Sequence, residues 1–381
     1  MTLRGPLFPG EEPRLRLRIL CPPWKGLPEG LREASVRCGA AEGSWGDRPA
    51  ILGDLRAFRT LCRDGLVPAG FRSELEALLD RSFRLRFRLG LPGGRELVLG
   101  DPPAIFGVLN VTPDSFSDGG RFLDPGRALD AALGMIQAGA DVIDVGGESS
   151  RPGSQGVDAG EERRRVEPVI RRIREAADIP ISIDTVKAEV ARMALAEGAD
   201  IINDISALRD DPGMIPLARD AGVPVVIAHR LGMPRDMQRG PRYDDATREV
   251  FQFLAERVRR LAADGIGPER IVVDPGIGFG KRVSDNVELL RDLGELRCLG
   301  LPVMVGASRK SFIGNLLGGA PVEARQAGTL AVHGAAVLAG AAAVRVHDVG
   351  AHKDLIRVLG ALAQGPEDPA GAPLSGGRRA P

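Results

Sequence analysis

The sequence predicts an α/β protein built on a closed (β/α)8 barrel of the TIM type, preceded by a β-hairpin and a small N-terminal α/β extension. Three observations support this fold. Short apolar runs rich in β-branched residues recur eight times between residues 104 and 348, each followed by a polar loop and a helical pattern. Every run ends in polar or charged side chains. The 381 residues suffice for a barrel of ~250 residues and one further module.

The eight expected strands span residues 104–111, 141–147, 180–185, 200–205, 224–229, 271–276, 302–308 and 342–348. Amphipathic segments such as 127–140 and 249–265 lie between them, and Gly139, Gly198 and Gly222 are placed to end helices. The uncharged run 326–344 indicates a packed helix entering the last strand, not a membrane span. Eight units favour a closed barrel. An open doubly wound sheet is the alternative. It is disfavoured because this sequence has no nucleotide-binding fingerprint after the first strand.

The region before the barrel has a different pattern. RLRLRIL (14–20) and FRLRFRL (83–89) alternate between apolar residues and arginine, as half-buried strands do. LPGGRELVL (91–99) supplies a turn and a return strand, so 83–99 predicts a hairpin that covers the bottom of the barrel. RSELEALLDRS (72–82) has a helical pattern. We expect an extension of undefined role over 1–81, the barrel with its hairpin over 82–363, and a disordered Pro/Gly/Ala-rich tail over 364–381.

Charge and cysteine content argue against several protein classes. Basic and acidic residues number 51 each, so no global charge favours nucleic acid or an anionic membrane. The four cysteines show neither CxxC pairing nor metal-ligand spacing, which favours reduced thiols in the cytoplasm. The N-terminus lacks the apolar stretch of a secretory signal.

Two tempting motifs are rejected, and one compositional signal is retained. DPGIGFGKR (274–282) fails the GxxxxGK[ST] phosphate-loop spacing because Arg282 stands where the hydroxyl belongs. His229 has no second His or Cys at ligand spacing, so we expect no zinc site. Only five lysines occur among the 51 basic residues. The lysines in strand-end loops therefore mark places where an ammonium is favoured over a guanidinium: Lys187, Lys281 and Lys310.

The residues that end the eight strands are the candidate functional residues, because such barrels carry their sites at the carboxyl ends of the strands. In strand order they are Asn110; Asp144; Asp184; Asn203 and Asp204; His229; Asp274; Ser308 followed by Arg309 and Lys310; and Arg345 with His347. Any one of them could be a satisfied hydrogen bond of the core. Eight of eight are hard to explain by packing alone.

These groups divide by chemistry. Asp184, Asn203 and Asp274 could accept paired N–H groups of an amino-substituted heteroaromatic ring. Arg345, His347 and Asn110 could hold phosphate oxygens, and Lys310 could lie between the two sets. An ion pair with Asp348, or with a carboxylate inside the barrel, is the alternative for Arg345.

Two long Gly-containing loops, 112–120 and 147–156, follow the first two strands, and this composition is typical of mobile lids. Phe116, in the first of them, is expected to face a substrate. A packed anchor on the barrel rim is the alternative.

Seven segments in order resemble dihydropteroate synthases over residues 105–348: LNVTPDSFSDGG, DVGGESSRPGS, ISIDT, IINDI, DPGIGFGK, GASRKSFIG and VRVHD. The resemblance implies a homodimeric (β/α)8 barrel and a transferase of folate biosynthesis that is a sulfonamide target. Such an enzyme condenses p-aminobenzoate with 6-hydroxymethyl-7,8-dihydropterin diphosphate and releases pyrophosphate, assisted by Mg²⁺.

The matching motifs also imply residue roles. The pterin would be bound by Asp184, Asn203, Asp274, Lys310 and Phe279. Asn110 would hold Mg²⁺ and the diphosphate, which Arg345 and His347 would also grip. The catalytic set would be Asp144, Lys310, Arg345 and His347, with Asp144 near the reacting end. The p-aminobenzoate pocket would comprise Phe116, Ser150, Arg151, Pro152 and Ser311, with Phe279 beside them. The implied chemistry is a dissociative substitution at the pterin methylene.

One barrel segment departs from the family pattern. AHRLGMP (228–234) stands where the family commonly has Met-His-Met-(Arg/Gln)-Gly-Thr-Pro, so Ala228 removes part of an apolar wall of the pterin pocket. A folate-binding methyltransferase domain is a rival on the same fold, and the ESSRPG, SRKS and VRVHD segments disfavour it. A catalytically inactive pterin-binding scaffold is a second rival. It is disfavoured by the presence of Asn110, Lys310, Arg345 and His347.

Overall fold

The computed structural model describes residues 17–20, 29–45, 48–53, 55–65, 67, 69–82, 84–112, 125–149, 153–154 and 156–364. The chain divides into two compact units. One comprises Arg84–Ile356, and the other comprises the residues up to Phe83 together with those from Arg357 onward. The domain boundaries predicted at residues 81 and 363 stay predictions, and the predicted tail from residue 365 lies outside the described residues.

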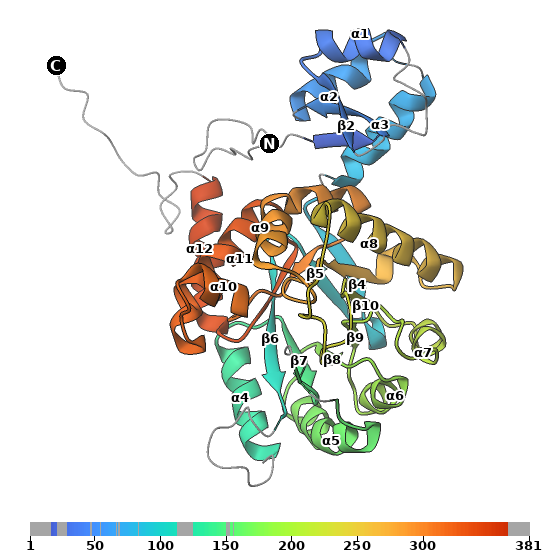
Figure 1. Cartoon of the computed structure of the whole chain (residues 1–381). Helices are drawn as coiled ribbons and strands as arrows, with labels where there is room; N and C mark the ends of the chain where they lie inside the picture. Colours follow the sequence, from blue (N-terminus) through green and yellow to red (C-terminus); the bar gives the residue numbers. More distant parts are fainter. Residues whose placement is uncertain are drawn as a thin grey trace, which may run out of the picture. The chain divides into compact units, whose positions relative to one another are not determined.

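Eight parallel strands form a ring at the centre of the larger unit (Figure 1). They are β6 (Ala104–Asn110), β7 (Val142–Gly146), β8 (Ile181–Asp184), β9 (Ile201–Asp204), β10 (Val225–Ala228), β11 (Ile271–Asp274), β12 (Met304–Val305) and β13 (Ala343–Val346). Consecutive strands pair from β6 to β11, β13 pairs with both β6 and β12, and a parallel bridge between Val273 and Val303 closes the ring. The predicted barrel is confirmed, and the doubly wound alternative is wrong.

Helices cover the outside of the ring (Figure 1). They are α4 (Pro125–Gln137), α5 (Ala159–Ala176), α6 (Ala188–Ala196), α7 (Met214–Ala221), α8 (Ala246–Ala263), α9 (Val283–Arg291), α10 (Ser311–Leu316), α11 (Gln326–Leu338) and α12 (Val349–Gln364), with short 3-10 turns η2 (Pro268–Arg270), η3 (Leu293–Leu299) and η4 (Val322–Arg325). Gly139, Gly198 and Gly222 follow their helices with φ of 99°, 101° and 68°, as expected of left-handed stops. The uncharged run forms α11 and the start of β13, as predicted.

The predicted hairpin covers the amino-terminal end of the barrel. Its strands β4 (Phe87–Gly90) and β5 (Glu96–Leu99) pair antiparallel around the turn η1 (Pro92–Gly94). Apolar side chains of the hairpin, Leu89, Leu91, Leu97 and Leu99, join one buried cluster with the barrel-strand residues Phe106, Val142, Ile201, Val226 and Val272. This burial removes the bottom of the barrel interior from water. The first strand of the hairpin is shorter than predicted, because residues 84–86 are not paired with the second strand.

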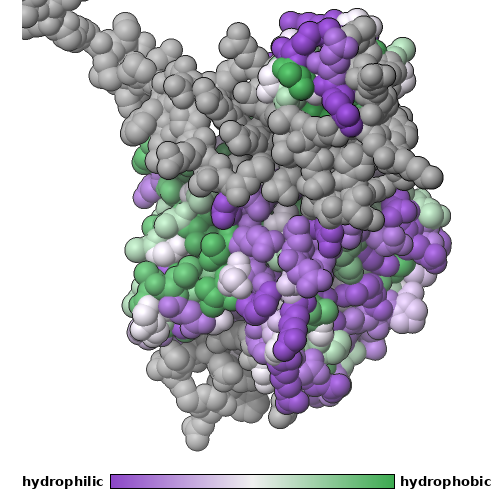
Figure 2. All heavy atoms as spheres, turned by 45° about the horizontal axis from the view of Figure 1, so that its top comes forward, coloured by the Kyte–Doolittle hydropathy of each residue, from purple (hydrophilic) through white to green (hydrophobic). Residues whose placement is uncertain are grey.

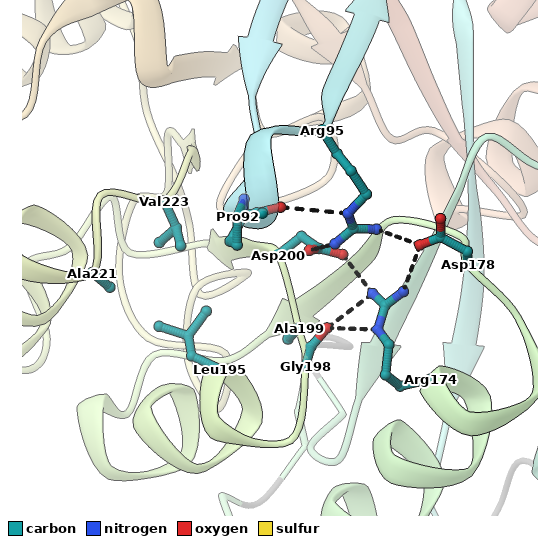
Figure 3. A pocket seen from close by; sticks show the side chains of 11 residues that line it. Pro92, Arg95, Arg174, Asp178, Leu195, Gly198, Ala199, Asp200, Ala221 and Val223 are labelled. Carbon is teal, nitrogen blue, oxygen red and sulfur yellow. Dashed lines mark hydrogen bonds and ion pairs between the residues drawn. The ribbon is translucent and has the colours of Figure 1, made fainter.

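An ion-pair network fastens the hairpin turn to the barrel (Figure 3). Arg95 donates to Asp178 at 3.0 Å and also to Asp200, while Arg174 donates to the other oxygen of Asp200 at 2.7 Å. These side chains line a pocket of ≈ 520 Å³ at the amino-terminal ends of the strands. Both arginines are neutralised by aspartates, so we assign this network to holding the hairpin in place.

The smaller unit is an α/β module, as predicted. Strands β1 (Leu17–Leu20), β2 (Ala41–Trp45) and β3 (Arg48–Gly53) form an antiparallel sheet in the order β1-β3-β2. Helices α1 (Glu29–Arg37), α2 (Leu55–Arg63) and α3 (Ala69–Ser82) complete it. Its core includes Leu31, Ile51, Phe58, Leu61 and Leu75. In neither unit does any described helix have the length and apolar character needed to cross a membrane.

Candidate active site

The strand ends bring four acid and amide side chains together around one arginine. Asp144 lies on β7, while Asp184 and Asp274 end β8 and β11 and Asn203 lies on β9. Arg345 projects from β13, which is far from them in sequence but closes the same ring. Because parallel strands of a barrel all point their carboxyl ends to one rim, residues at corresponding positions converge there.

Arg345 is held by two carboxylates. Its Nε donates to Asp144 Oδ2 at 2.5 Å, and its Nη2 donates to Asp184 Oδ2 at 2.6 Å. The amide nitrogen of Asn203 donates to both oxygens of Asp144, at 3.3 and 3.2 Å. The predicted alternative of an ion pair with an inner carboxylate therefore holds for Arg345. Asp144 is completely buried, so it lies beneath this arginine rather than open to solvent.

Burial shifts the proton affinities of the other acids. Removal from water raises the pKa of Asp184 to about 7, and nearby Asp144 adds to this while Arg345 opposes it. Burial also raises the pKa of Asp274, which Lys310 opposes, and Asp274 Oδ1 accepts a hydrogen bond from the Gly276 N–H at 2.6 Å. A Cβ on Gly306 would lie 3.6 Å from both Asp274 Oδ2 and Arg345 Cβ, so Asp274 adjoins the same cluster. Perturbed acids grouped at a barrel rim are typical of a functional site.

Lys310 places an ammonium over an aromatic ring beside these acids. Its Nζ lies 4.0 Å from the Phe279 ring centroid and donates to the Ile277 carbonyl. Burial lowers the pKa of Lys310 to about 8, which Asp274 partly offsets. Phe279 is buried with Ile205, Ala228 and Met237 in one apolar cluster, so Met237 packs in the same place as the small Ala228 side chain. Ser311, next in sequence to Lys310, begins α10 and is exposed.

Asn110 and His347 complete the rim. Asn110 ends β6 and is half-buried, and a Cβ on Gly146 would lie 3.7 Å from Asn110 Oδ1 and 3.7 Å from Asp184 Oδ2. The two oxygens therefore face the same glycine. His347, after β13, has its Nδ1 2.9 Å from Ser308 Oγ, and Ser308 follows β12. This contact links the ends of two neighbouring strands.

Comparison with known proteins decides the family. The model of the family described as "Pterin binding enzyme" matches residues 106–347. The dihydropteroate synthase of Synechocystis is 45% identical over 273 residues, which cover 71% of this chain and 94% of the relative.

The chain belongs to the dihydropteroate synthase family.

Solved structures agree. The dihydropteroate synthase of Xanthomonas albilineans with 4-aminobenzoic acid is 46% identical with a TM-score of 0.67, covering 72% of this chain and 97% of that one. The Yersinia pestis synthase with a sulfonamide drug is 40% identical with a TM-score of 0.68, covering 72% and 98%. The family match contains every strand-end residue from Asn110 to His347. It does not include the smaller unit.

Sequence reasoning noted Lys281 but did not foresee its role. Lys281 is buried, and its Nζ donates to the carbonyl oxygens of Gly276 (2.8 Å), Phe279 (3.2 Å) and His229 (3.3 Å) and lies 2.9 Å from His229 Nδ1. The loop after β11 therefore turns its carbonyl groups onto a cation, the opposite of a phosphate loop. Gly276 permits this, because at φ 67° a Cβ would lie 1.9 Å from the His229 carbonyl oxygen.

Lys187 also has a local partner set, since it bridges Glu148 and Glu162. Of the three lysines that the composition singled out, Lys310 alone adjoins the acids around Arg345. The scarcity of lysine in this sequence singled out all three residues, but it did not separate the lysine beside the acids from the two that are held by loop groups.

Several predicted residues of this dihydropteroate synthase family member lie outside the described residues. They are Phe116 of the first predicted lid and three residues of the expected p-aminobenzoate pocket, Ser150, Arg151 and Pro152. The described part of the second loop is tied down at several points: the Gly153 N–H donates to the Pro234 carbonyl at 2.9 Å, Arg165 donates to the Gly147 carbonyl at 2.8 Å, and Glu148 pairs with Lys187. The lid assignments stay predictions.

Proposed function

We propose that this chain joins p-aminobenzoate to 6-hydroxymethyl-7,8-dihydropterin diphosphate, forming 7,8-dihydropteroate and releasing pyrophosphate. The observation that carries this proposal is the cluster of Asp144, Asp184, Asn203 and Asp274 around Arg345, in a chain 45% identical to a dihydropteroate synthase. The 4-aminobenzoic acid of the Xanthomonas structure and the sulfonamide of the Yersinia structure support the choice of substrate.

The acids and Lys310 bind the pterin in this proposal. A pterin presents adjacent ring N–H and amino N–H donors, which suit the carboxylates of Asp184 and Asp274 and the side-chain oxygen of Asn203. Lys310 supplies the complementary donor to a ring oxygen or nitrogen. Phe279 gives the planar ring an apolar face. A site of this kind rejects rings that lack these donors, because its buried acceptors would be left without partners.

Arg345, His347 and Asn110 bind the diphosphate. Arg345 commits its Nε and Nη2 to Asp144 and Asp184, which fixes the guanidinium and leaves Nη1 for a diphosphate oxygen. Although burial disfavours its charge, these two carboxylates raise the pKa of Arg345, so it stays cationic throughout the working pH range. A fixed cation at the departing oxygens stabilises the charge that develops there.

Mg²⁺ would be held by Asn110 Oδ1 and by oxygens of the diphosphate. Asn110 supplies the hard oxygen donor that Mg²⁺ prefers, and this ion commonly takes few protein ligands together with substrate phosphates and waters. The described residues hold no cluster of three or more His, Cys, Asp or Glu that could bind a metal alone. Metal binding in this proposal therefore depends on the diphosphate. When bound, the ion neutralises leaving-group charge.

The substitution is dissociative in this proposal. The pterin methylene–oxygen bond breaks first, and the electron pair leaves with the diphosphate. The resulting pterin cation is stabilised by the carboxylates of Asp144 and Asp184 nearby. The aniline nitrogen of p-aminobenzoate then forms the new bond and releases its proton. A strong dependence of the rate on the nucleophilicity of substituted p-aminobenzoates would contradict this order of steps.

The enzyme is a homodimer in this proposal, and an apolar surface of the larger unit supports it. Ala327, Ala331, Ala335 and Leu338 are exposed at helical spacing along α11, and Leu338 is 60% exposed. Leu316 and Leu317 at the end of α10 are also exposed. Figure 2 shows apolar residues gathered on the side where Figure 1 places these helices. Light scattering tests this, with Ala331→Glu expected to yield a monomer.

We also assign the enzyme to the cytoplasm. The described cysteines, Cys38, Cys62 and Cys298, form no disulfide, which suits a reducing compartment.

The test of the activity is pyrophosphate release from the pterin diphosphate and p-aminobenzoate, measured with and without Mg²⁺. We expect turnover that requires both substrates and the metal, and inhibition by a sulfonamide that competes with p-aminobenzoate. A folded sample without turnover would overturn the proposal.

A further inference from the structure

Two buried histidines that the proposed chemistry does not use connect the ends of β12 and β13. His333 lies on α11 and His352 on α12, and both side chains are completely buried. The Ala307 N–H, after β12, donates to His333 Nε2 at 3.1 Å. His333 Nδ1 lies 2.8 Å from His352 Nε2, and His352 Nδ1 lies 2.6 Å from the carbonyl oxygen of Asp348, after β13.

The partners at the two ends determine where every proton lies. A backbone N–H only donates, so His333 Nε2 must accept, and neutral His333 then carries its proton on Nδ1. That N–H donates to His352 Nε2, so His352 carries its own proton on Nδ1 and donates it to the Asp348 carbonyl. All four ring nitrogens are satisfied by one arrangement of two neutral rings.

A single extra proton breaks this chain wherever it binds. On His333 it would point an N–H at the Ala307 N–H. On His352 it would point an N–H at His333 Nδ1–H, and exchange of the His333 tautomer would only move the clash to Ala307. Burial lowers the pKa of His333 well below its usual value, with His352, Lys310 and His347 adding to this, and burial lowers the pKa of His352 against the opposing Asp348. Both rings are therefore neutral at pH 7.

The two ends of this hydrogen-bond chain lie beside two residues of the proposed site: His347, which binds the diphosphate, and Lys310, which binds the pterin. Ala307 precedes Ser308, whose Oγ lies 2.9 Å from His347 Nδ1 and accepts the His347 N–H at 3.3 Å. Asp348 directly follows His347, and Lys310 lies two residues beyond Ser308. The histidine pair and the Ser308–His347 contact are thus two separate links between the ends of the same two strands, β12 and β13.

We propose that His333 and His352 form an acid-sensitive positioning pair that sets His347 and the Ser308–Lys310 segment at the distance that binding of the pterin diphosphate requires. This inference rests on the proposed roles of His347 and Lys310. Neither histidine touches a substrate; both act through the strand ends. Protonation of the pair at acid pH breaks the Ala307–His333 or the His333–His352 hydrogen bond, so the two strand ends are no longer linked through the pair and affinity for the pterin diphosphate falls.

Nitrogen-15 NMR of the full chain tests the tautomers directly, because the chain has four histidines and single His→Gln variants assign them. We expect His333 and His352 to be neutral at pH 7 with protons on Nδ1, in contrast to His229, whose Nδ1 faces the Lys281 ammonium. A proton on Nε2 of either ring at pH 7 would overturn the proposal.

Steady-state kinetics across pH tests the positioning role. His333→Ala should raise KM for the pterin diphosphate roughly tenfold at pH 8, with a smaller change in kcat. His352→Gln keeps an acceptor for the His333 Nδ1–H and cannot be protonated, but it loses the donor to the Asp348 carbonyl. It should therefore raise KM at pH 8 by less than His333→Ala does, and it should lose part of the further rise in KM at acid pH. Asp184 also titrates near neutral pH, so the difference between wild type and His352→Gln is the measurement that counts.

Asp141→Ala is the matched control. Asp141 Oδ2 accepts the Ile105 N–H at 2.8 Å and so joins two neighbouring strands, β6 and β7, at the opposite end of the barrel. Loss of this bond should lower stability and leave KM unchanged. An acid limb of KM that is identical in wild type and His352→Gln would overturn the proposal. An equal rise of KM in Asp141→Ala and His333→Ala would also overturn it. Neither result would count against the proposed activity, because turnover by the wild type establishes that separately.

Discussion

Replacing Arg345 by methionine is the sharpest test of how the candidate site is built. Arg345 forms two short ion pairs. Its removal leaves the carboxylates of Asp144, whose side chain is 0% exposed, and Asp184, whose side chain is 10% exposed, without a cationic partner. Loss of one partner of a buried ion pair typically costs about 3–5 kcal/mol, because the remaining charge stays buried without compensation. We expect a loss of this size for the barrel at pH 8.5. It corresponds to a fall in melting temperature of roughly 6–20 °C.

The pH dependence of this loss of stability distinguishes the effect of an unpaired buried charge from the effect of lost packing. Burial already raises the pKa of Asp184 to about 7, and removal of Arg345, which opposes that rise, should raise it further. A carboxyl whose folded pKa exceeds its unfolded pKa of ~3.9 binds protons preferentially in the folded state, so it destabilises folding at high pH and less as the pH falls. The difference in free energy of unfolding between wild type and Arg345→Met should therefore be smaller at pH 5.5 than at pH 8.5.

Calorimetry at the two pH values measures this, following the transition of the barrel. Arg345→Met with Asp184→Asn is the control, because the second change neutralises one stranded carboxylate and should recover at least ~1 kcal/mol at pH 8.5. A destabilisation that is equal at pH 8.5 and 5.5, and unaffected by Asp184→Asn, would refute the reasoning. The loss would then be one of packing alone.

Four further outcomes are expected. Lys310→Ala and Asp184→Ala should each weaken pterin binding about tenfold in calorimetry. Wild-type affinity should fall as the pH rises through about 8, where the Lys310 ammonium loses its proton, and unchanged affinity in both variants would contradict the site. Lys281→Met should lower the free energy of unfolding in urea by about 2–4 kcal/mol, because three buried carbonyl groups lose the hydrogen bond from the Lys281 side chain. The exposed control Arg259→Met should change it by less than ~0.5 kcal/mol. Mg²⁺ alone should leave the melting temperature unchanged, and Mg²⁺ with the pterin diphosphate should raise it above the value with the diphosphate alone; stabilisation by the metal alone would contradict ligation through Asn110 and the substrate.

Much of the candidate site could be predicted because the ends of the barrel strands are visible in the sequence as polar residues that follow short apolar runs. Asp144, Asp184, Asn203 and Asp274 each end or nearly end a short β-branched run, and the parallel topology then places them on one rim. Strand extent was harder. The seventh strand was expected over 302–308 but spans Met304–Val305, in part because the Ala307 N–H is bonded to His333 instead of to a neighbouring strand. No local pattern reveals that a histidine on a later helix will take this donor.

By itself, the sequence determined the barrel, its hairpin and the chemical character of each strand end, because alternation and helical period record which side of each segment is buried. The tertiary structure alone decided which groups are partners. Arg345 meets carboxylates 161 and 201 residues earlier in the chain, Lys281 is enclosed by carbonyl groups while Lys310 adjoins the acids, and two histidines on different helices fix each other's protons. Such pairings depend on how close remote segments come in the fold and on how far their side chains are removed from water. Neither quantity can be read from the residues that are neighbours in the sequence.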